Sequence, residues 1–181
     1  NSLAHALVER SVDNIIGEGM TPKPVSSDGG WNQAVSAWWK KNYQADAMAR
    51  FSNAELMRVW FRSYLRDGDI GALMLKGGQV QTIESDYIQS PGGFGDMYTD
   101  GRADPNVIDG FKVGASGQAQ TAYVATSTPG GETVWKPVPI RHLLFHANYD
   151  RANRTATRGV PALAIVRPLL EQIDGTKEAV V

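Results

Sequence analysis

The chain has 181 residues, enough for a single domain with a sizeable hydrophobic core. It contains no cysteine, which excludes disulfides, thiolate zinc sites and cysteine nucleophiles. Its net charge of −1 gives no global field to attract nucleic acid or an anionic membrane, and no apolar run approaches the roughly 20 residues that span a bilayer.

Three helices are predicted in the N-terminal third of the chain. The first covers residues 2–16, where apolar side chains recur at helical spacing, and it ends at Gly17. The second runs from residue 31 to about residue 43. The third begins at the capping box Ser52-Asn53-Ala54-Glu55 and ends at Gly68. We expect the aromatic face of this third helix to be buried against a sheet; it consists of Trp60, Phe61 and Tyr64.

The middle of the chain predicts short strands separated by turns rich in glycine. Alternation of polar and apolar residues with closely spaced turns is typical of an antiparallel sheet with one solvated face. Gly77-Gly78 is predicted to close a tight hairpin. The predicted strands are residues 70–76, 79–83, 107–113, 118–127, 133–138 and 142–146.

A last helix is predicted from Pro161 to Asp174, with a kink at Pro168. The predicted fold class is therefore α+β: one antiparallel sheet, a meander of short strands, with three N-terminal helices and one C-terminal helix. The chain begins at Asn1 and stops within an apparent helix, so we expect an internal piece of a longer protein.

Two sets of residues invite a catalytic or metal-binding interpretation. His142 and His146 would lie roughly 13 Å apart on a strand, too far for one metal ion, so we interpret them as structural. The acidic loop Asp96–Asp104 leaves a small hydrolase open as an alternative function. No nucleophile or base motif accompanies its carboxylates, and we expect the loop to bind no catalytic metal.

Arg58, Arg62 and Arg66 recur every four residues on the third helix and form a basic stripe opposite its aromatic face. This arginine stripe could contact phosphates, which leaves a nucleic-acid-binding module as a further alternative. The other interpretation is a solvated helix face with local Arg–Glu pairing.

Several segments, in order, together resemble one known family, the portal proteins of lambda-like tailed phages and prophages. "VDNIIGEGMTPKP", "FSNAELMRVWFRSYLRDGDIGALM" and "VQTIESDYIQSP" are similar to its early helices and first strands. "VIDGFKVGASGQAQTAYVA", "VPIRHLLFH" and "TRGVPALAIVRPLLEQI" are similar to its later hairpin, strand and helix. The family-signature positions in this chain are Glu84, Asp86, Gly110, Gly117, Tyr123, Arg158, Gly159 and Pro161.

The resemblance implies a structural subunit with no catalytic residues, no metal and no cofactor. It implies a homo-oligomeric ring, usually dodecameric, at a capsid vertex, through whose channel double-stranded DNA is packaged and ejected. The implied partners are terminase, the major capsid protein and head–tail connector proteins, in the virion and, during assembly, in the host cytoplasm, with no membrane. Residues 1–181 would be a single wing-like domain, with stem, clip and crown lying beyond it.

Overall fold

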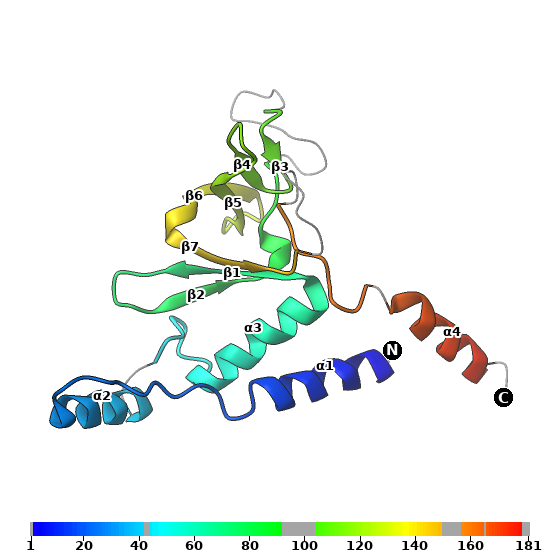
Figure 1. Cartoon of the computed structure of the whole chain (residues 1–181). Helices are drawn as coiled ribbons and strands as arrows, with labels where there is room; N and C mark the ends of the chain where they lie inside the picture. The colour runs from blue at the N-terminus through cyan, green and yellow to red at the C-terminus, as the bar shows by residue number, and fades with distance from the viewer. Residues whose placement is uncertain (1, 42–43, 92–103, 150–156, 165, 179–181) are drawn as a thin grey trace.

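The computed structural model describes residues 2–41, 44–91, 104–149, 157–164 and 166–178. It contains four helices and two antiparallel sheets, which confirms the predicted α+β class. The elements lie in layers: β3–β6 above, then β1, β2 and β7, then α3, then α1 (Figure 1). The helices α2 and α4 project to opposite sides of this stack (Figure 1).

The helix α3 (Asn53–Asp67) has both of its ends defined by local chemistry. Ser52 and Glu55 form the predicted capping box, in which each side chain accepts a hydrogen bond from the other's backbone N–H. Gly68 ends the helix in the left-handed conformation, with φ of 91°. The helix α1 (Ser2–Ile15) buries Val8 and Val12 and lies against α3.

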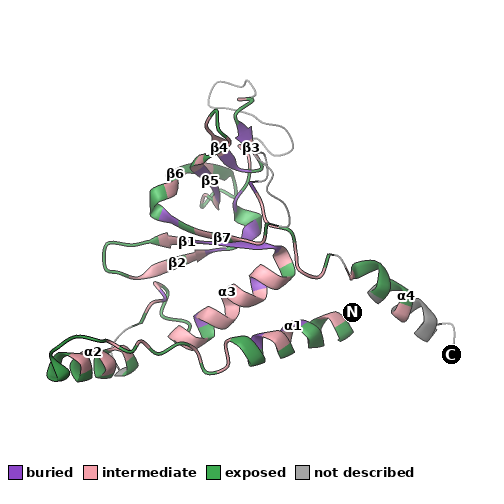
Figure 2. Cartoon of the chain, in the orientation of Figure 1, coloured by how far each residue is buried: buried purple, intermediate pink, exposed green. Residues whose placement is uncertain are grey.

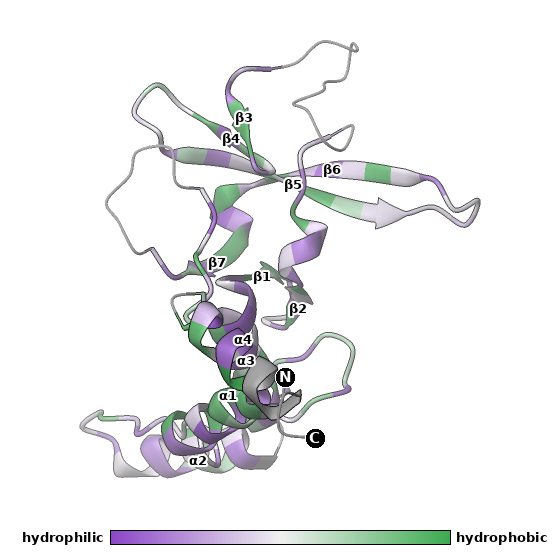
Figure 3. Ribbon diagram, turned by 90° about the vertical axis from the view of Figure 1, so that its right-hand side faces the viewer, coloured by the Kyte–Doolittle hydropathy of each residue, from purple (hydrophilic) through white to green (hydrophobic). Residues whose placement is uncertain are grey.

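Among the side chains that the structure describes, none on the other two helices is buried. None of residues 29–40 of α2 (Gly29–Lys41) is buried, and the helix mixes hydrophobic and hydrophilic residues (Figure 3). The expected helix start at Pro161 is wrong, because a turn precedes α4 (Arg167–Glu178). Pro168 therefore lies in the first turn of α4, where its missing N–H costs little, and not at a mid-helix kink.

The first sheet has the strand order β2-β1-β7. Its strands are β1 (Asp69–Met74), β2 (Val80–Ile83) and β7 (Leu143–Ala147). The predicted Gly77-Gly78 hairpin joins β1 to β2 and pairs Met74 with Val80. β1 is thus the central strand and pairs on its other side with β7, which is about 70 residues away in the chain.

The second sheet has the order β3-β4-β5-β6, so the expectation of a single sheet is corrected to two. Its strands are β3 (Val107–Ile108), β4 (Phe111–Val113), β5 (Ala119–Ser127) and β6 (Thr133–Pro139). The single strand predicted at residues 107–113 is a hairpin instead. Asp109 and Gly110 both have positive φ, 48° and 88°, which is the geometry of a two-residue hairpin turn.

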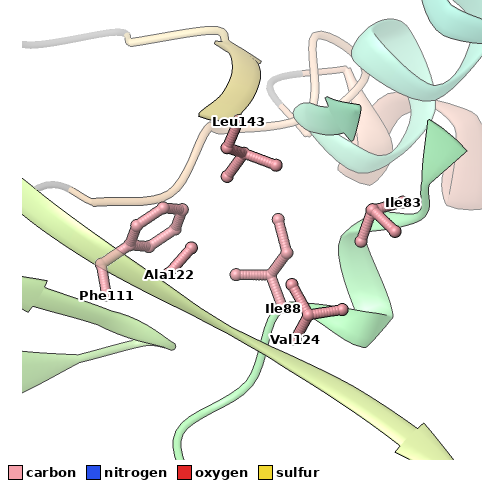
Figure 4. Close-up of a cluster of buried hydrophobic side chains, with 6 residues drawn as sticks. All are labelled: Ile83, Ile88, Phe111, Ala122, Val124 and Leu143. Carbon is pink, nitrogen blue, oxygen red and sulfur yellow. The ribbon is translucent and has the colours of Figure 1, made fainter. Parts of the chain in front are cut away.

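The core lies between the two sheets. Ile88 is buried at its centre, with side chains of both sheets pointing toward it (Figure 4). Ile88 follows the short 3-10 helix η1 (Ser85–Tyr87) and forms an isolated bridge with Val124 of β5. The buried members of the cluster are Ile83, Ile88, Phe111, Ala122, Val124 and Leu143.

The aromatic face of α3 contacts the first sheet but is only partly buried (Figure 2). Trp60 donates from Nε1 to Thr82 Oγ1 of β2 at 2.9 Å, and Tyr64 stacks on His146 of β7 with ring centroids 4.8 Å apart. The expected burial of Trp60, Phe61 and Tyr64 is wrong, because α3 turns Leu56 and Ser63 fully inward instead.

Candidate functional site

Two of the family-signature positions, Arg158 and Gly159, meet at one buried carboxylate, that of Asp69 at the start of β1. Asp69 is only 1% exposed. The guanidinium of Arg158 binds it in a fork, with Nε 2.7 Å from Oδ2 and Nη2 2.9 Å from Oδ1. The backbone N–H of Gly159 also donates to Oδ2, at 2.9 Å. Both carboxylate oxygens are therefore satisfied, as a buried charge requires.

Arg158 also contacts the segment that follows β2, residues 84–89, which we call the link. Its Nη1 donates to the carbonyl of Ile88 at 2.9 Å, and its Nη2 donates to the carbonyl of Ser85 at 3.0 Å. The Ser85 hydroxyl lies between the two charged groups and donates to Asp69. One guanidinium thus holds the first sheet and the link together.

Residues 157–162, which we call the strap, are attached along their whole length. Thr157 donates to the carbonyl of Ile108 at 3.3 Å, which ties the strap to β3. Val160 N–H donates to the Asn148 carbonyl at 2.8 Å, and Asn148 Nδ2 donates back to the Val160 carbonyl at 3.0 Å. The strap ends where Ala162 N–H reaches the Leu65 carbonyl of α3, at 3.1 Å.

Two further signature positions support the link from the second sheet. Gly110, in the β3–β4 turn, lies so close to the link that a Cβ there would be 2.8 Å from the backbone nitrogen of Gln89. Tyr123 N–H donates to the Gly110 carbonyl, and the Tyr123 carbonyl accepts from Gln89 N–H. Of the remaining positions, Glu84 and Asp86 are exposed on the link and Gly117 occupies the β4–β5 turn.

The arginine stripe of α3 faces α1, and two of its members are engaged there. Arg58 pairs with Asp13 and donates to the Gly17 carbonyl at 3.0 Å. Arg62 binds Glu9 in a fork at 2.6 and 2.9 Å. The hydrogen bond from Arg62 lowers the pKa of the Glu9 carboxyl, and the same bond raises the pKa of Arg62. These contacts place the guanidinium groups between two helices of this chain.

Arg66 has a different setting at the end of α3. It binds the neighbouring Asp67 in a fork with two contacts of 2.7 Å, and its side chain is 60% exposed. The hydrogen bond to Asp67 raises the pKa of Arg66, and the charges of Glu84 and Asp86 act in the same direction. Arg66 is thus the most exposed member of the stripe, within a largely acidic neighbourhood.

The candidate catalytic and metal-binding residues have other settings where the structure describes them. Asp96 and Asp100 are outside the described residues, while Asp104 begins a turn and pairs with Lys112 at 3.1 Å. His142 lies in the 3-10 helix η2 (Ile140–His142), one residue before the strand that carries His146. Across the described part of the chain, no three His, Asp or Glu side chains converge as a metal site would need.

A shallow apolar hollow lies between α3 and the first sheet. Its lining includes Trp60, Leu144 and His146. It brings no carboxylate or basic side chain together with a nucleophile. No described helix combines the length and apolarity needed to cross a bilayer.

The resemblance to the family identified Arg158 and Gly159 as signature positions, but the sequence did not identify Asp69, the carboxylate that both of them bind. One signal was available: Asp69 begins the strand "DIGALM", whose other residues are uncharged, and a carboxylate buried with such a strand calls for a cationic partner.

Comparison with known proteins gives one match that covers the chain from end to end. The family of phage portal proteins described as the lambda family matches residues 1–181. No curated protein sequence matches.

Proposed function

Since this chain belongs to the lambda family of phage portal proteins, we propose that residues 1–181 form a wing-like domain of a portal subunit. Membership implies a structural role in phage assembly, within an oligomer of the virion capsid. The observation that carries the proposal is the extent of the family match, residues 1–181. The contacts around Asp69 support the proposal, because the signature positions Arg158 and Gly159 hold segments of the fold together there and form no catalytic group.

We further propose that the full subunit forms a closed ring at a capsid vertex, a dodecamer by family resemblance. In this proposal double-stranded DNA passes through the channel of the ring, terminase docks during packaging, and head–tail connector proteins bind afterwards. The layered body with helices projecting on opposite sides suits a ring, because each subunit of a ring uses two different faces.

The hydrolase alternative has less support than the scaffold role. The family is structural, and the described acids serve turns and ion pairs: Asp104 accepts from the backbone N–H of Asn106 at 3.1 Å. The nucleic-acid alternative is also less favoured, because Arg58 and Arg62 are paired with α1.

Electron microscopy of the purified full-length subunit tests the proposed function. We expect closed rings with a central channel and with residues 1–181 on the outer part of each subunit. Insertion of a small tag in the exposed β5–β6 turn at Gly130 gives a marker for this domain. A ring with the tag inside the channel would contradict the wing assignment, and a subunit that stays monomeric would contradict the ring.

A further inference from the structure

We propose that Arg158 couples the strap to the link, so that local opening of either segment opens the other. The coupling would join the segment that leads to α4 with the region between the two sheets. It concerns this chain alone and does not depend on the proposed function.

The side chain of Arg158 reaches from the strap into two other segments of the chain. Arg158 is covalently part of the strap, yet all five acceptors that bind its guanidinium belong to other segments. Two are oxygens of Asp69, two are the link carbonyls of Ser85 and Ile88, and the fifth is the Ser85 hydroxyl oxygen. The strap cannot leave its position without withdrawing all of these donors at once.

Withdrawal would leave groups that cannot turn to water. Asp69 is 1% exposed, and Ser85 and Ile88 are buried as well. Removing one partner of a buried ion pair leaves an uncompensated charge, which costs far more than the pair contributes when intact. A buried carbonyl that loses its hydrogen-bond donor also destabilises the fold. The link is therefore less stable without the strap.

The reverse dependence follows from the same bonds. If the link moved, Arg158 would lose its two carbonyl acceptors and the Ser85 hydroxyl, and would keep only Asp69. The link in turn is attached to β5, because Gln89 N–H donates to the Tyr123 carbonyl at 3.1 Å and Ile88 bridges to Val124. A displacement of the strap is thus transmitted through the link to β5, the longest strand of the second sheet. Because coupling is reciprocal, a displacement of the link must affect the strap as well.

Amide hydrogen exchange on two mild variants tests the coupling. Asn148→Ala removes the side-chain bond to Val160, in the middle of the strap, and leaves Arg158 intact. We expect exchange at the link amides of Ile88 and Gln89 to accelerate roughly three- to tenfold. Ser85→Ala disturbs the link, and we expect a similar acceleration at the strap amides of Gly159 and Val160.

Three further variants isolate the role of Arg158. Asn148→Ala also removes the hydrogen bond from the Tyr64 hydroxyl to Asn148 Oδ1. Tyr64→Phe removes only that bond, so it measures how much of the Asn148→Ala effect comes from it. Arg158→Lys keeps the charge but loses the fork, so exchange should rise in both segments and the cross-effects should disappear. Arg167→Lys is the matched control, because it breaks an exposed pair with Glu171 and should change neither segment.

The contradicting result is equally specific. If Asn148→Ala accelerates exchange only in the strap and Ser85→Ala only in the link, the two segments open independently and the coupling is refuted. These two variants decide the question even if Arg158→Lys fails to fold.

Discussion

The backbones of Gly68 and Gly159 are in direct contact, so that a Cβ on Gly159 would lie 1.9 Å from the carbonyl oxygen of Gly68. The contact joins the C-cap of α3 to the strap. Gly68 has φ of 91°, which favours glycine there on conformational grounds as well. At Gly159 any larger residue would overlap the backbone of Gly68. At Gly68 a larger residue would both overlap the backbone of Gly159 and need a positive φ.

Gly159→Ala should destabilise the chain by at least about 1–3 kcal/mol, the usual cost of forcing extra volume into a packed site. The obstructing atom belongs to backbone, so it cannot rotate away as a side chain would. Chemical denaturation measures the free energy of unfolding directly. Gly29→Ala is the control, because a Cβ there meets nothing within 4 Å and should not destabilise. Equal stability of the two variants would mean that the strap sits elsewhere.

A second prediction concerns Asp46, which is 4% exposed and organises the loop between α2 and α3. Its carboxylate accepts three backbone bonds, from Met48 at 3.1 Å, Arg50 at 2.8 Å and Phe51 at 3.1 Å. Burial acts to raise the pKa of this carboxyl, but the three N–H groups outweigh it and the pKa lies below its ordinary value. Asp46→Asn replaces one acceptor oxygen by an amino group and should cost about 1–3 kcal/mol at pH 7.

The pH dependence of that cost has a defined sign. A carboxyl whose pKa is lower in the folded state stabilises fully above its unfolded pKa, about 3.9 for Asp. The difference between wild type and Asp46→Asn should therefore shrink as the pH falls below about 4. Asp28→Asn is the comparison, since Asp28 caps α2 at an exposed site where Asn serves equally well. A difference that is constant from pH 7 to pH 3 would contradict the lowered pKa.

The sequence predicted the parts of this fold that local chemistry controls. The capping box at Ser52 and the Gly77-Gly78 hairpin depend on residues close together in the chain, and both are confirmed. The division into two sheets was not predicted, because it depends on β7 pairing with β1 across about 70 residues. Pairing between distant strands leaves no local periodicity in the sequence. The link, residues 84–89, shows no such periodicity either.

The contacts around Asp69 could not be predicted for the same reason, because they join residues far apart in the chain. Arg158 and Gly159 were found through family resemblance, but their partner Asp69 lies 89 residues from Arg158. The aromatic face of α3 shows a different failure. Helical periodicity located the face, yet the helix is rotated so that Leu56 and not Phe61 points fully inward. Periodicity alone does not distinguish a central position of an apolar face from an edge position.

That rotation leads to a third prediction. Leu56→Ala should cost about 2–5 kcal/mol, because Leu56 is only 3% exposed and its loss leaves a cavity. Phe61→Ala should cost less than the 3–5 kcal/mol of a fully buried phenylalanine, since Phe61 is half-buried. Thermal and chemical denaturation of the two variants rank them. A larger loss for Phe61→Ala would restore the original assignment of the buried face.

A fourth prediction separates stability from nucleic-acid binding in the arginine stripe. Arg62→Ala should destabilise the packing of α1 on α3, because it leaves Glu9 without its fork partner. It should leave any binding of duplex DNA, and the dependence of that binding on salt, unchanged. Arg10→Ala, which removes an exposed charge from α1, is the control for net charge. A shallower salt dependence for Arg62→Ala alone would show that Arg62 contacts phosphates.

The last prediction concerns association of residues 1–181 by themselves, which we expect to be monomeric or to associate only weakly. The exposed apolar side chains are spread over separate elements, with Leu7 and Ile15 on α1, Trp31 on α2 and Leu169 on α4. A stable interface usually buries more than about 1,000 Å² in one complementary surface, which scattered residues on projecting helices do not provide.

Ring formation is more demanding still, because a heterologous contact closes only when the geometry of the whole subunit is correct. Sedimentation velocity at micromolar concentration measures the association state of the chain. Leu169→Asp and Trp31→Asp then report whether α4 or α2 contributes to any weak association that is seen. A discrete closed ring at that concentration would mean that residues 1–181 carry the information for assembly themselves, and the proposal that other parts of the subunit are needed would be wrong.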